Sequence, residues 1–219
     1  MISSTMAVTS SRRLPLIEAF AFPAFVAWFI WQLQDASPYS WILLPIWLIA
    51  SFALNKDTPQ SLGWRVDNFW SATKRASAVF IPCALAILVT GFLLDGVQHA
   101  FYQLLNPERF LGYMSFCLLQ QVALNSLVTN RLLAAMDSPL RASLISGLFF
   151  ALLHWPNPVL VPLTFVGGAL MAWLFWKDRN ILTLTIWQTI LGTLAWKAFP
   201  IAWHHSMRVG PGYYNFHLH

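Results

Sequence analysis

Five polar side chains interrupt apolar stretches of the chain and are the first candidates for chemistry. They are Gln120, Gln121, Asn125, His154 and Gln188. Histidine is the one side chain among them that exchanges a proton near neutral pH, so His154 is the candidate acid or base. The amides donate and accept hydrogen bonds but do not titrate at this pH, so none of them can act as a general base.

The spacing of the amides indicates which of them share a helix face. Gln121 and Asn125 are four residues apart and therefore lie on one face, whereas Gln120 points about a quarter of a turn away. Amides surrounded by hydrocarbon need hydrogen-bond partners, so we expect them to face the interior of a helix bundle. They could line one polar pocket with His154 and Gln188, or they could only join helices through hydrogen bonds of roughly 0.6–2 kcal/mol each.

The composition predicts that these residues lie in a membrane. Of the 219 residues, 58% are hydrophobic and 10% are charged, and the mean hydropathy is +0.58, whereas about 25% of the residues of a soluble domain are charged. Repeated apolar runs near membrane-spanning length predict an all-α, polytopic transmembrane bundle. About seven spans are expected, at residues 15–34, 39–54, 77–98, 113–135, 140–155, 159–176 and 181–199.

Polar segments flank this membrane domain and indicate its orientation. Residues 1–14 are expected to form a disordered cytoplasmic tail, residues 15–199 the transmembrane domain, and residues 200–219 a C-terminal tail. With the N-terminus in the cytoplasm, all but three of the 13 Lys and Arg residues fall on the cytoplasmic side, the exceptions being Arg109, Lys197 and Arg208. We therefore expect an integral membrane protein in a lipid bilayer, with a bacterial inner membrane as the expected location.

Metal, cofactor, disulfide and nucleic-acid functions are not indicated by the sequence. A single His among amides is a poor zinc site, because zinc normally takes three or four Cys, His or carboxylate ligands. Cys83 and Cys117 lie in apolar runs and are expected to be packing thiols. The sequence carries neither a phosphate-binding loop nor a basic nucleic-acid patch. We therefore expect no metal, no cofactor and no nucleic-acid partner.

The order and spacing of the polar residues resemble the CPBP family of CAAX proteases and bacteriocin-processing intramembrane proteases. That family has Glu-Glu-x-x-x-Arg, Phe-x-x-x-His and His-x-x-x-Asn or Asp as successive motifs. Phe150-x-x-x-His154 matches the second motif, and the resemblance extends from Leu62-Gly63 to about Trp196. It implies a CPBP-like helical bundle and an intramembrane endopeptidase in which a carboxylate activates water with help from histidines.

The chain departs from the first and third motifs of that family. Gln120-Gln121 stands where the family has Glu-Glu, Asn125 where it has Arg, and Gln188 where it has the second His. Each change replaces an ionisable group with a neutral hydrogen-bonding group. Losing one member of a cooperating catalytic set typically costs orders of magnitude in rate, and here several members are replaced together.

These departures predict a pseudoenzyme, a non-proteolytic membrane protein that binds a membrane protein partner or a lipid-like ligand in the former active-site cavity. That pocket would be lined by Gln120, Gln121, Asn125, Phe150 and Gln188. Two alternatives stay open. A membrane enzyme of another class could act on an isoprenoid or lipid substrate with His154 as its catalytic residue. Alternatively, some intramembrane endopeptidase activity could remain.

Overall fold

Helices are the only regular elements in the part of the chain that the structure describes. The computed structural model describes residues 2–34, 36–37, 39–94 and 107–216. The all-α prediction is confirmed for these residues, which include no strand. The α-helices are α1 (Ile2–Trp28), α2 (Leu43–Leu54), α3 (Phe69–Leu93), α5 (Pro107–Gln121), α6 (Asn130–Ala135), α7 (Pro139–Leu152), α8 (Leu160–Asp178), α9 (Ile181–Ala198), α10 (Ile201–His204) and α11 (Pro211–Tyr214).

Segments whose turns are wider (π-helical) or tighter (3₁₀) than those of an α-helix lie next to some of these helices. The π-helical segment η1 (Phe29–Leu33) extends α1, and a second π-helical segment, η4 (Val122–Thr129), joins α5 to α6. Two short 3₁₀ turns, η2 (Ser40–Ile42) and η5 (His205–Met207), lead into α2 and follow α10. The α5–η4–α6 rod is therefore one long helical element whose middle is widened.

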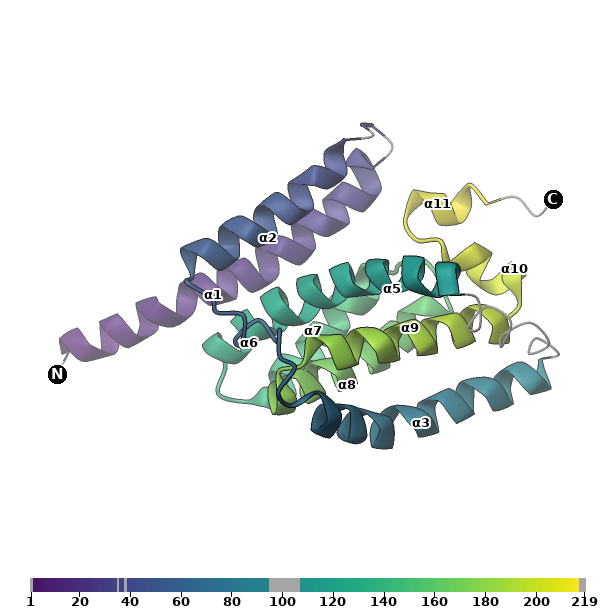
Figure 1. Ribbon diagram of the computed structural model, residues 1–219. Helices are drawn as coiled ribbons and strands as arrows, with labels where there is room; N and C mark the ends of the chain where they lie inside the picture. The colour runs from purple at the N-terminus through teal and green to yellow at the C-terminus, as the bar shows by residue number, and fades with distance from the viewer. Residues whose placement is uncertain (1, 35, 38, 95–106, 217–219) are drawn as a thin grey trace.

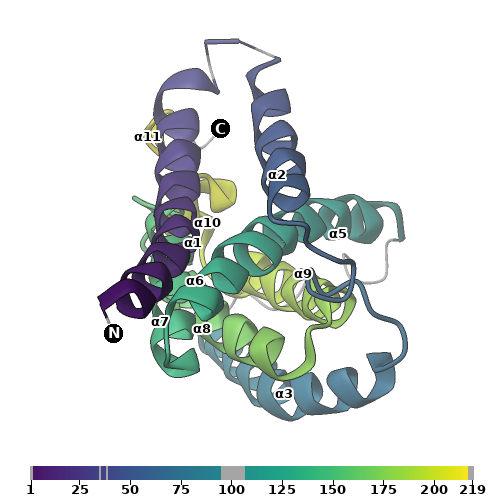
Figure 2. The ribbon, with the colours of Figure 1, turned by 90° about the vertical axis from the view of Figure 1, so that its left-hand side faces the viewer.

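The helices form a bundle from which one hairpin diverges. Within the bundle, α7 packs against α8, while α3 and α5 both pack against α9 (Figure 1). The helix α1 crosses α6 and η4, and α2 returns beside it to contact η4. Figure 2 shows α1 and α2 rising from the bundle as two separated rods.

Four helical elements are long and apolar enough to cross a membrane. They are Arg13–Leu33, Phe69–Leu93, Glu108–Ala135 and Leu160–Asp178. Two further apolar helices, Ser40–Leu54 and Pro139–Leu152, are shorter, and α9 has 18 residues. The prediction of an integral, polytopic helical membrane protein is confirmed at this level, whereas the number of seven crossings stays a prediction.

Two helix starts differ from the expected ones. The helix α1 begins at Ile2, before the expected start of the first span at residue 15; residues 1–14 contain neither Gly nor Pro to interrupt it. The helix α3 begins at Phe69, earlier than the expected span at residue 77, because its first two turns contain the charged residues Lys74 and Arg75, which hydropathy leaves out of a span. Hydropathy locates the apolar part of a helix, and the backbone continues beyond it. The expected end of this span, at residue 98, lies outside the described residues.

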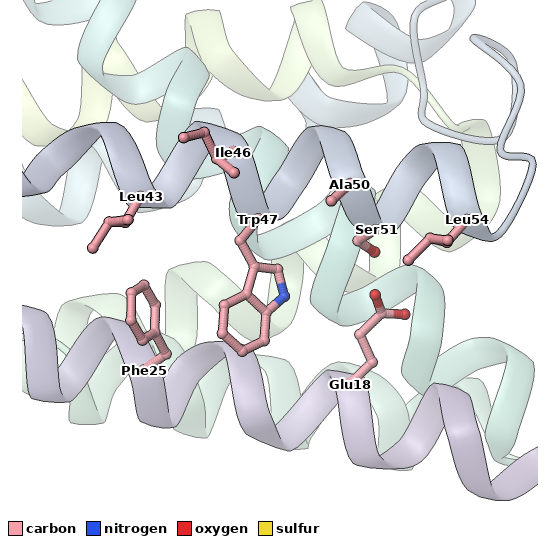
Figure 3. A pocket seen from close by; sticks show the side chains of 8 residues that line it. All are labelled: Glu18, Phe25, Leu43, Ile46, Trp47, Ala50, Ser51 and Leu54. Carbon is pink, nitrogen blue, oxygen red and sulfur yellow. The ribbon is translucent and has the colours of Figure 1, made fainter.

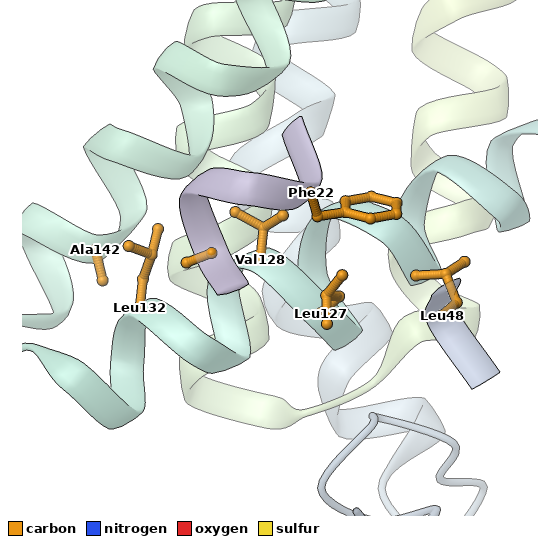
Figure 4. Packing of buried hydrophobic residues seen from close by; sticks show 7 residues of the cluster. Phe22, Leu48, Leu127, Val128, Leu132 and Ala142 are labelled. Carbon is orange, nitrogen blue, oxygen red and sulfur yellow. The ribbon is translucent and has the colours of Figure 1, made fainter. Parts of the chain in front are cut away.

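Two apolar clusters hold the helices together. The first joins the hairpin to the α5–η4–α6 rod and α7 (Figure 4), and its buried members are Ala19, Phe22, Leu48, Leu127, Val128, Leu132 and Ala142. The second joins α3, α8 and α9, and its buried members are Ala76, Phe80, Met171, Leu174, Phe175, Ile181 and Leu184. The first cluster thus lies on the hairpin side of the rod and the second on the side of α8 and α9.

Glycines set the close approach of α7 to α8. A Cβ on Gly147 of α7 would lie 2.6 Å from the Phe165 carbonyl oxygen, and a Cβ on Gly168 of α8 would lie 3.1 Å from Phe150 Cδ1. A Cβ on the neighbouring Gly167 would meet nothing within 4 Å. Helices in membranes approach closely where both present small residues. In this pair, Gly147 and Gly168 have that role.

Replacing Gly147 with alanine is expected to lower the free energy of unfolding by about 1–3 kcal/mol, because the new methyl group would push apart two helix backbones. Gly167→Ala is the matched control and is expected to be neutral or slightly stabilising, since alanine is the better helix former by about 1 kcal/mol. Unfolding by sodium dodecyl sulfate in mixed micelles, followed by circular dichroism, measures both. Equal stability of the two variants would contradict the packing described for α7 and α8.

Candidate functional site

Gln121 lies at the centre of a chain of buried amides. Its Nε2 donates to Gln188 Oε1 at 2.5 Å and to the sulfur of Met171 at 2.9 Å, and its Oε1 accepts from Asn125 Nδ2 at 2.6 Å. The side chains of Gln121 and Asn125 are 0% exposed. These contacts join α5, η4, α8 and α9 at one buried point.

This series of hydrogen-bonded side chains extends beyond Gln188 in one direction and beyond Asn125 in the other. Gln188 Nε2 donates to Gln120 Oε1 at 2.5 Å, so both neighbouring glutamines of α5 bond the same residue of α9. At the other end, Thr129 Oγ1 donates to Asn125 Oδ1 at 3.0 Å and lies 2.9 Å from Ser146 Oγ of α7. We call the set Gln120, Gln188, Gln121, Asn125, Thr129 and Ser146 the amide chain.

The widened turn η4 aligns three members of the amide chain. Asn130 N–H bonds the carbonyl of Asn125, five residues earlier, as in a π-helix. Such a turn brings residues four apart more nearly into line than an α-helix does. Gln121, Asn125 and Thr129 are spaced in this way, and each bonds the next. The four-residue spacing in the sequence indicated the pair Gln121 and Asn125. The continuation of this spacing to Thr129 was not predicted.

Gly192 stands where the third family motif has Asn or Asp. A Cβ at Gly192 would overlap the hydroxyl group of Tyr113. The phenol of Tyr113, from α5, therefore occupies the space that a side chain at this position of α9 would need. Any side chain larger than glycine at this position would therefore require Tyr113 to move.

His154 lies near the amide chain along α7 but has a different partner. Ser146, Phe150 and His154 follow one another at four-residue intervals along α7 and the turn after it. The Nδ1 atom of His154 is 2.6 Å from the Phe150 carbonyl oxygen, and the two rings meet edge-to-face at 4.7 Å. Because a carbonyl only accepts, Nδ1 carries the proton and Nε2 keeps its lone pair. Among the described residues, no hydrogen bond joins His154 to the amide chain.

The amide chain is neutral, and its buried polar atoms have hydrogen-bond partners. Every buried side-chain nitrogen or oxygen of the described residues has a hydrogen-bond partner. Within those same residues, no group of three His, Cys, Asp or Glu side chains is close enough together to hold a metal ion. The arrangement can therefore join helices and orient hydrogen bonds, but it offers no titratable group of its own.

A second polar cluster, the charged cluster, was not expected from the sequence. Arg131 of α6 bonds Glu18 of α1 at 2.6 Å, Asp57 at 2.5 Å and the hydroxyl of Ser51 of α2 at 3.1 Å. Its side chain is only 5% exposed. By the distribution of Lys and Arg in the sequence, Arg131 is expected on the cytoplasmic side. The missed signal was a carboxylate in the first apolar run, Glu18, and an arginine in the fourth, which need partners if they are buried.

The Leu62–Gly63 segment connects this end of the molecule to the amide chain. The Leu62 carbonyl accepts from Ser126 Oγ of η4 at 2.6 Å, and the Gly63 carbonyl accepts from the Ile181 N–H at the start of α9 at 2.9 Å. Gly63 has a φ of +87°, a left-handed conformation that glycine adopts without strain. This segment therefore fixes η4 and α9, which contribute Asn125 and Gln188 to the amide chain.

The C-terminal segment packs over the turn that follows His154. Asn157 Nδ2 donates to the carbonyls of His204 at 2.8 Å and Arg208 at 3.0 Å, and Gly210 N–H donates to the Trp155 carbonyl at 2.9 Å. Burial lowers the pKa of His204 below its ordinary value. Its neutral ring accepts from the backbone N–H of Met207. The segment thus covers the end of the bundle where His154 lies.

The fold and this buried polar chain define an α-helical integral membrane protein with polar contacts between its helices. Residues 110–194 match the family model described as Type II CAAX prenyl endopeptidase Rce1-like. The resemblance to the CAAX protease family is therefore confirmed over this segment, which contains the amide chain, Phe150 and His154. No curated protein and no solved structure matches the chain.

Proposed function

We propose that this protein is a non-proteolytic relative of the CAAX proteases that binds another membrane protein. The observation that carries this proposal is the amide chain, because amides at the positions of the family's ionisable groups bond one another. Hydrolysis of a peptide needs a group that takes a proton from water, and an amide does not do this near neutral pH. The amides instead form hydrogen bonds that join the helices.

The same hydrogen bonds favour a protein partner over a ligand bound among the amides. Gln121 uses both its nitrogen and its oxygen on other side chains, and Asn125 does the same. A ligand would have to break these bonds, which leaves buried polar groups unpaired at about 1–3 kcal/mol each. A membrane protein that packs against the outside of the bundle has no such cost.

We also propose seven crossings with a cytoplasmic N-terminus in a bacterial inner membrane. Support comes from the ends of the helices. The segment 55–68, the turn between α6 and α7 and the turn between α8 and α9 lie at one end of the bundle (Figure 1). Most Lys and Arg residues belong to this end, as the positive-inside rule requires of a cytoplasmic face.

A second candidate function rests on His154. Its Nε2 has a free lone pair and no protein partner among the described residues. A neutral imidazole held through Nδ1 is the usual form of a general base. A membrane enzyme of another class, acting on an isoprenoid or lipid substrate, would use this atom. It is favoured only if a substrate-derived product disappears with His154→Ala.

The proteolysis test uses a membrane-anchored, prenylated peptide and the protein in liposomes. We expect no fragments from the wild-type protein and none from the double variant Gln120→Glu/Gln121→Glu, since the remaining motif residues are still replaced. We expect His154→Ala to reduce stability by about 0.5–1.5 kcal/mol, the net value of one hydrogen bond. Fragments that appear with wild type and vanish with His154→Ala would show that the endopeptidase activity survives.

The partner test is native mass spectrometry of the protein extracted from its own membrane. We expect a stoichiometric membrane protein to be retained. The Gln121→Asn variant shortens one member of the amide chain and is the control for the integrity of the bundle. A small apolar molecule that is bound in place of a protein, and that is lost in His154→Ala/Gln188→Ala, would contradict the partner proposal and favour the enzyme.

A further inference from the structure

A groove between α1 and α2 lies on the other side of the α5–η4–α6 rod from the amide chain. It has a volume of about 460 Å³ and is lined by Glu18, Phe25, Leu43, Ile46, Trp47, Ala50, Ser51 and Leu54 (Figure 3). Phe25 stacks on Trp47 at 5.0 Å. Pockets of about 300–1,000 Å³, mostly apolar and with a few polar groups, are typical of small-ligand sites. Both helices of the groove belong to the apolar part of the protein.

Only one end of the groove is polar, and its carboxylate has unused capacity. Glu18 Oε2 accepts from Arg131 at 2.6 Å and from Asn55 at 3.2 Å. No hydrogen bond from the described residues reaches Glu18 Oε1. The Glu18 side chain is 14% exposed, and Figure 3 shows its carboxylate between the two helices, next to Ser51. Among the described residues, one oxygen of Glu18 therefore has no donor and can accept from a group that enters the groove.

The charge at this end is complementary to a cation. The charged cluster contains two carboxylates, Glu18 and Asp57, and one guanidinium, Arg131. Both oxygens of Asp57 are bonded by Arg131. Asp57 also interacts electrostatically with Arg179. The carboxylate that keeps an oxygen without a donor from the described residues is therefore that of Glu18, and an ammonium group can form a charge-assisted hydrogen bond with it.

We propose that this groove binds a membrane lipid with a primary ammonium head group, an ethanolamine phospholipid, by one of its hydrocarbon chains. The ammonium group bonds Glu18 and the chain lies along Phe25, Trp47 and Ile46. Glu18 is near the start of the first candidate span, Arg13–Leu33, at head-group level. From Glu18 to Phe25 the helix rises about 10 Å, so the chain follows the direction of a lipid tail. This site is separate from the amide chain and does not depend on the proposed function.

The experiment titrates delipidated, detergent-solubilised protein with dioleoyl lipids and counts bound molecules by native mass spectrometry. The lipids carry ethanolamine, choline or glycerol head groups. We expect the ethanolamine lipid to bind about tenfold more tightly than the other two, a difference of about 1.4 kcal/mol. We expect Glu18→Gln to remove this preference. We expect Ala50→Trp, which fills the groove, to weaken all binding by about tenfold.

The matched control is Ala53→Trp, three residues further along α2, exposed and outside the groove. It is expected to bind as the wild-type protein does. Equal binding of all three lipids by the wild-type protein would overturn the head-group assignment. Unchanged binding by Ala50→Trp would overturn the groove as the site, even if Glu18→Gln proves unstable. A protein segment cross-linked at residue 50 in native membranes would also overturn the lipid as occupant.

Discussion

Replacing Arg131 with methionine is expected to lower the free energy of unfolding by about 3–5 kcal/mol, the usual cost of removing one partner of a buried ion pair. The guanidinium separates the carboxylates of Glu18 and Asp57, and its own side chain is 5% exposed. Without it, two partly buried carboxylates would lose their counter-charge. Because Glu18 belongs to α1 and Asp57 follows α2, the whole hairpin should loosen. Chemical unfolding in mixed micelles measures the change.

Arg141→Met is the control for this prediction, since Arg141 is an exposed arginine at the start of α7 and exposed ion pairs contribute about 0–1 kcal/mol. A rescue variant sharpens the test. Adding Glu18→Gln and Asp57→Asn to Arg131→Met removes the uncompensated charges and is expected to restore most of the loss. A cost for Arg131→Met no larger than that for Arg141→Met would show that the charged cluster does not hold the hairpin.

The second large effect is expected for Gln121→Leu. Leucine has a similar size but would leave Asn125 Nδ2 and Gln188 Oε1 without their partner. Water cannot replace Gln121, because the site is 0% exposed. Each unpaired buried group costs about 1–3 kcal/mol, so a loss of roughly 2–5 kcal/mol is expected. The measurement is the same unfolding experiment.

Gln120→Leu is the matched control within the same helix. Gln120 is only half-buried and bonds a single partner, Gln188 Nε2. One unpaired group, with water nearby, is expected to cost less than about 1.5 kcal/mol. If Gln120→Leu and Gln121→Leu were equally destabilised, Gln121 would not be the centre of the amide chain.

The two polar clusters differ in the charge that they contain and in how deeply it is buried. The amide chain contains no charge, so it needs no counter-ion among four helical elements. The charged cluster keeps its ions near one end of the spans, with Glu18 and Asp57 partly reached by solvent. Charges deep in a bilayer are costly and usually paired. Because the amide chain is uncharged, it is buried without the desolvation cost of an ion.

The class of protein was already determined by the sequence. Membrane helices are encoded locally, because about 20 consecutive apolar residues are enough to make a span favourable. The same holds for the pair Gln121 and Asn125, whose four-residue spacing places them on one face in any helix. The motif Phe150-x-x-x-His154 likewise indicated the family whose model matches residues 110–194.

Only the tertiary structure decided which polar groups meet. Gln121 and Gln188 are 67 residues apart in the sequence, and Glu18 and Arg131 are 113 apart. Hydropathy and periodicity predict which face of a helix is buried but not which helix packs against that face. They therefore could not separate His154 from the amide chain or pair Arg131 with Glu18. The neighbour is chosen by close packing, as at Gly147 and Gly168, and by the need of each buried polar group for a partner.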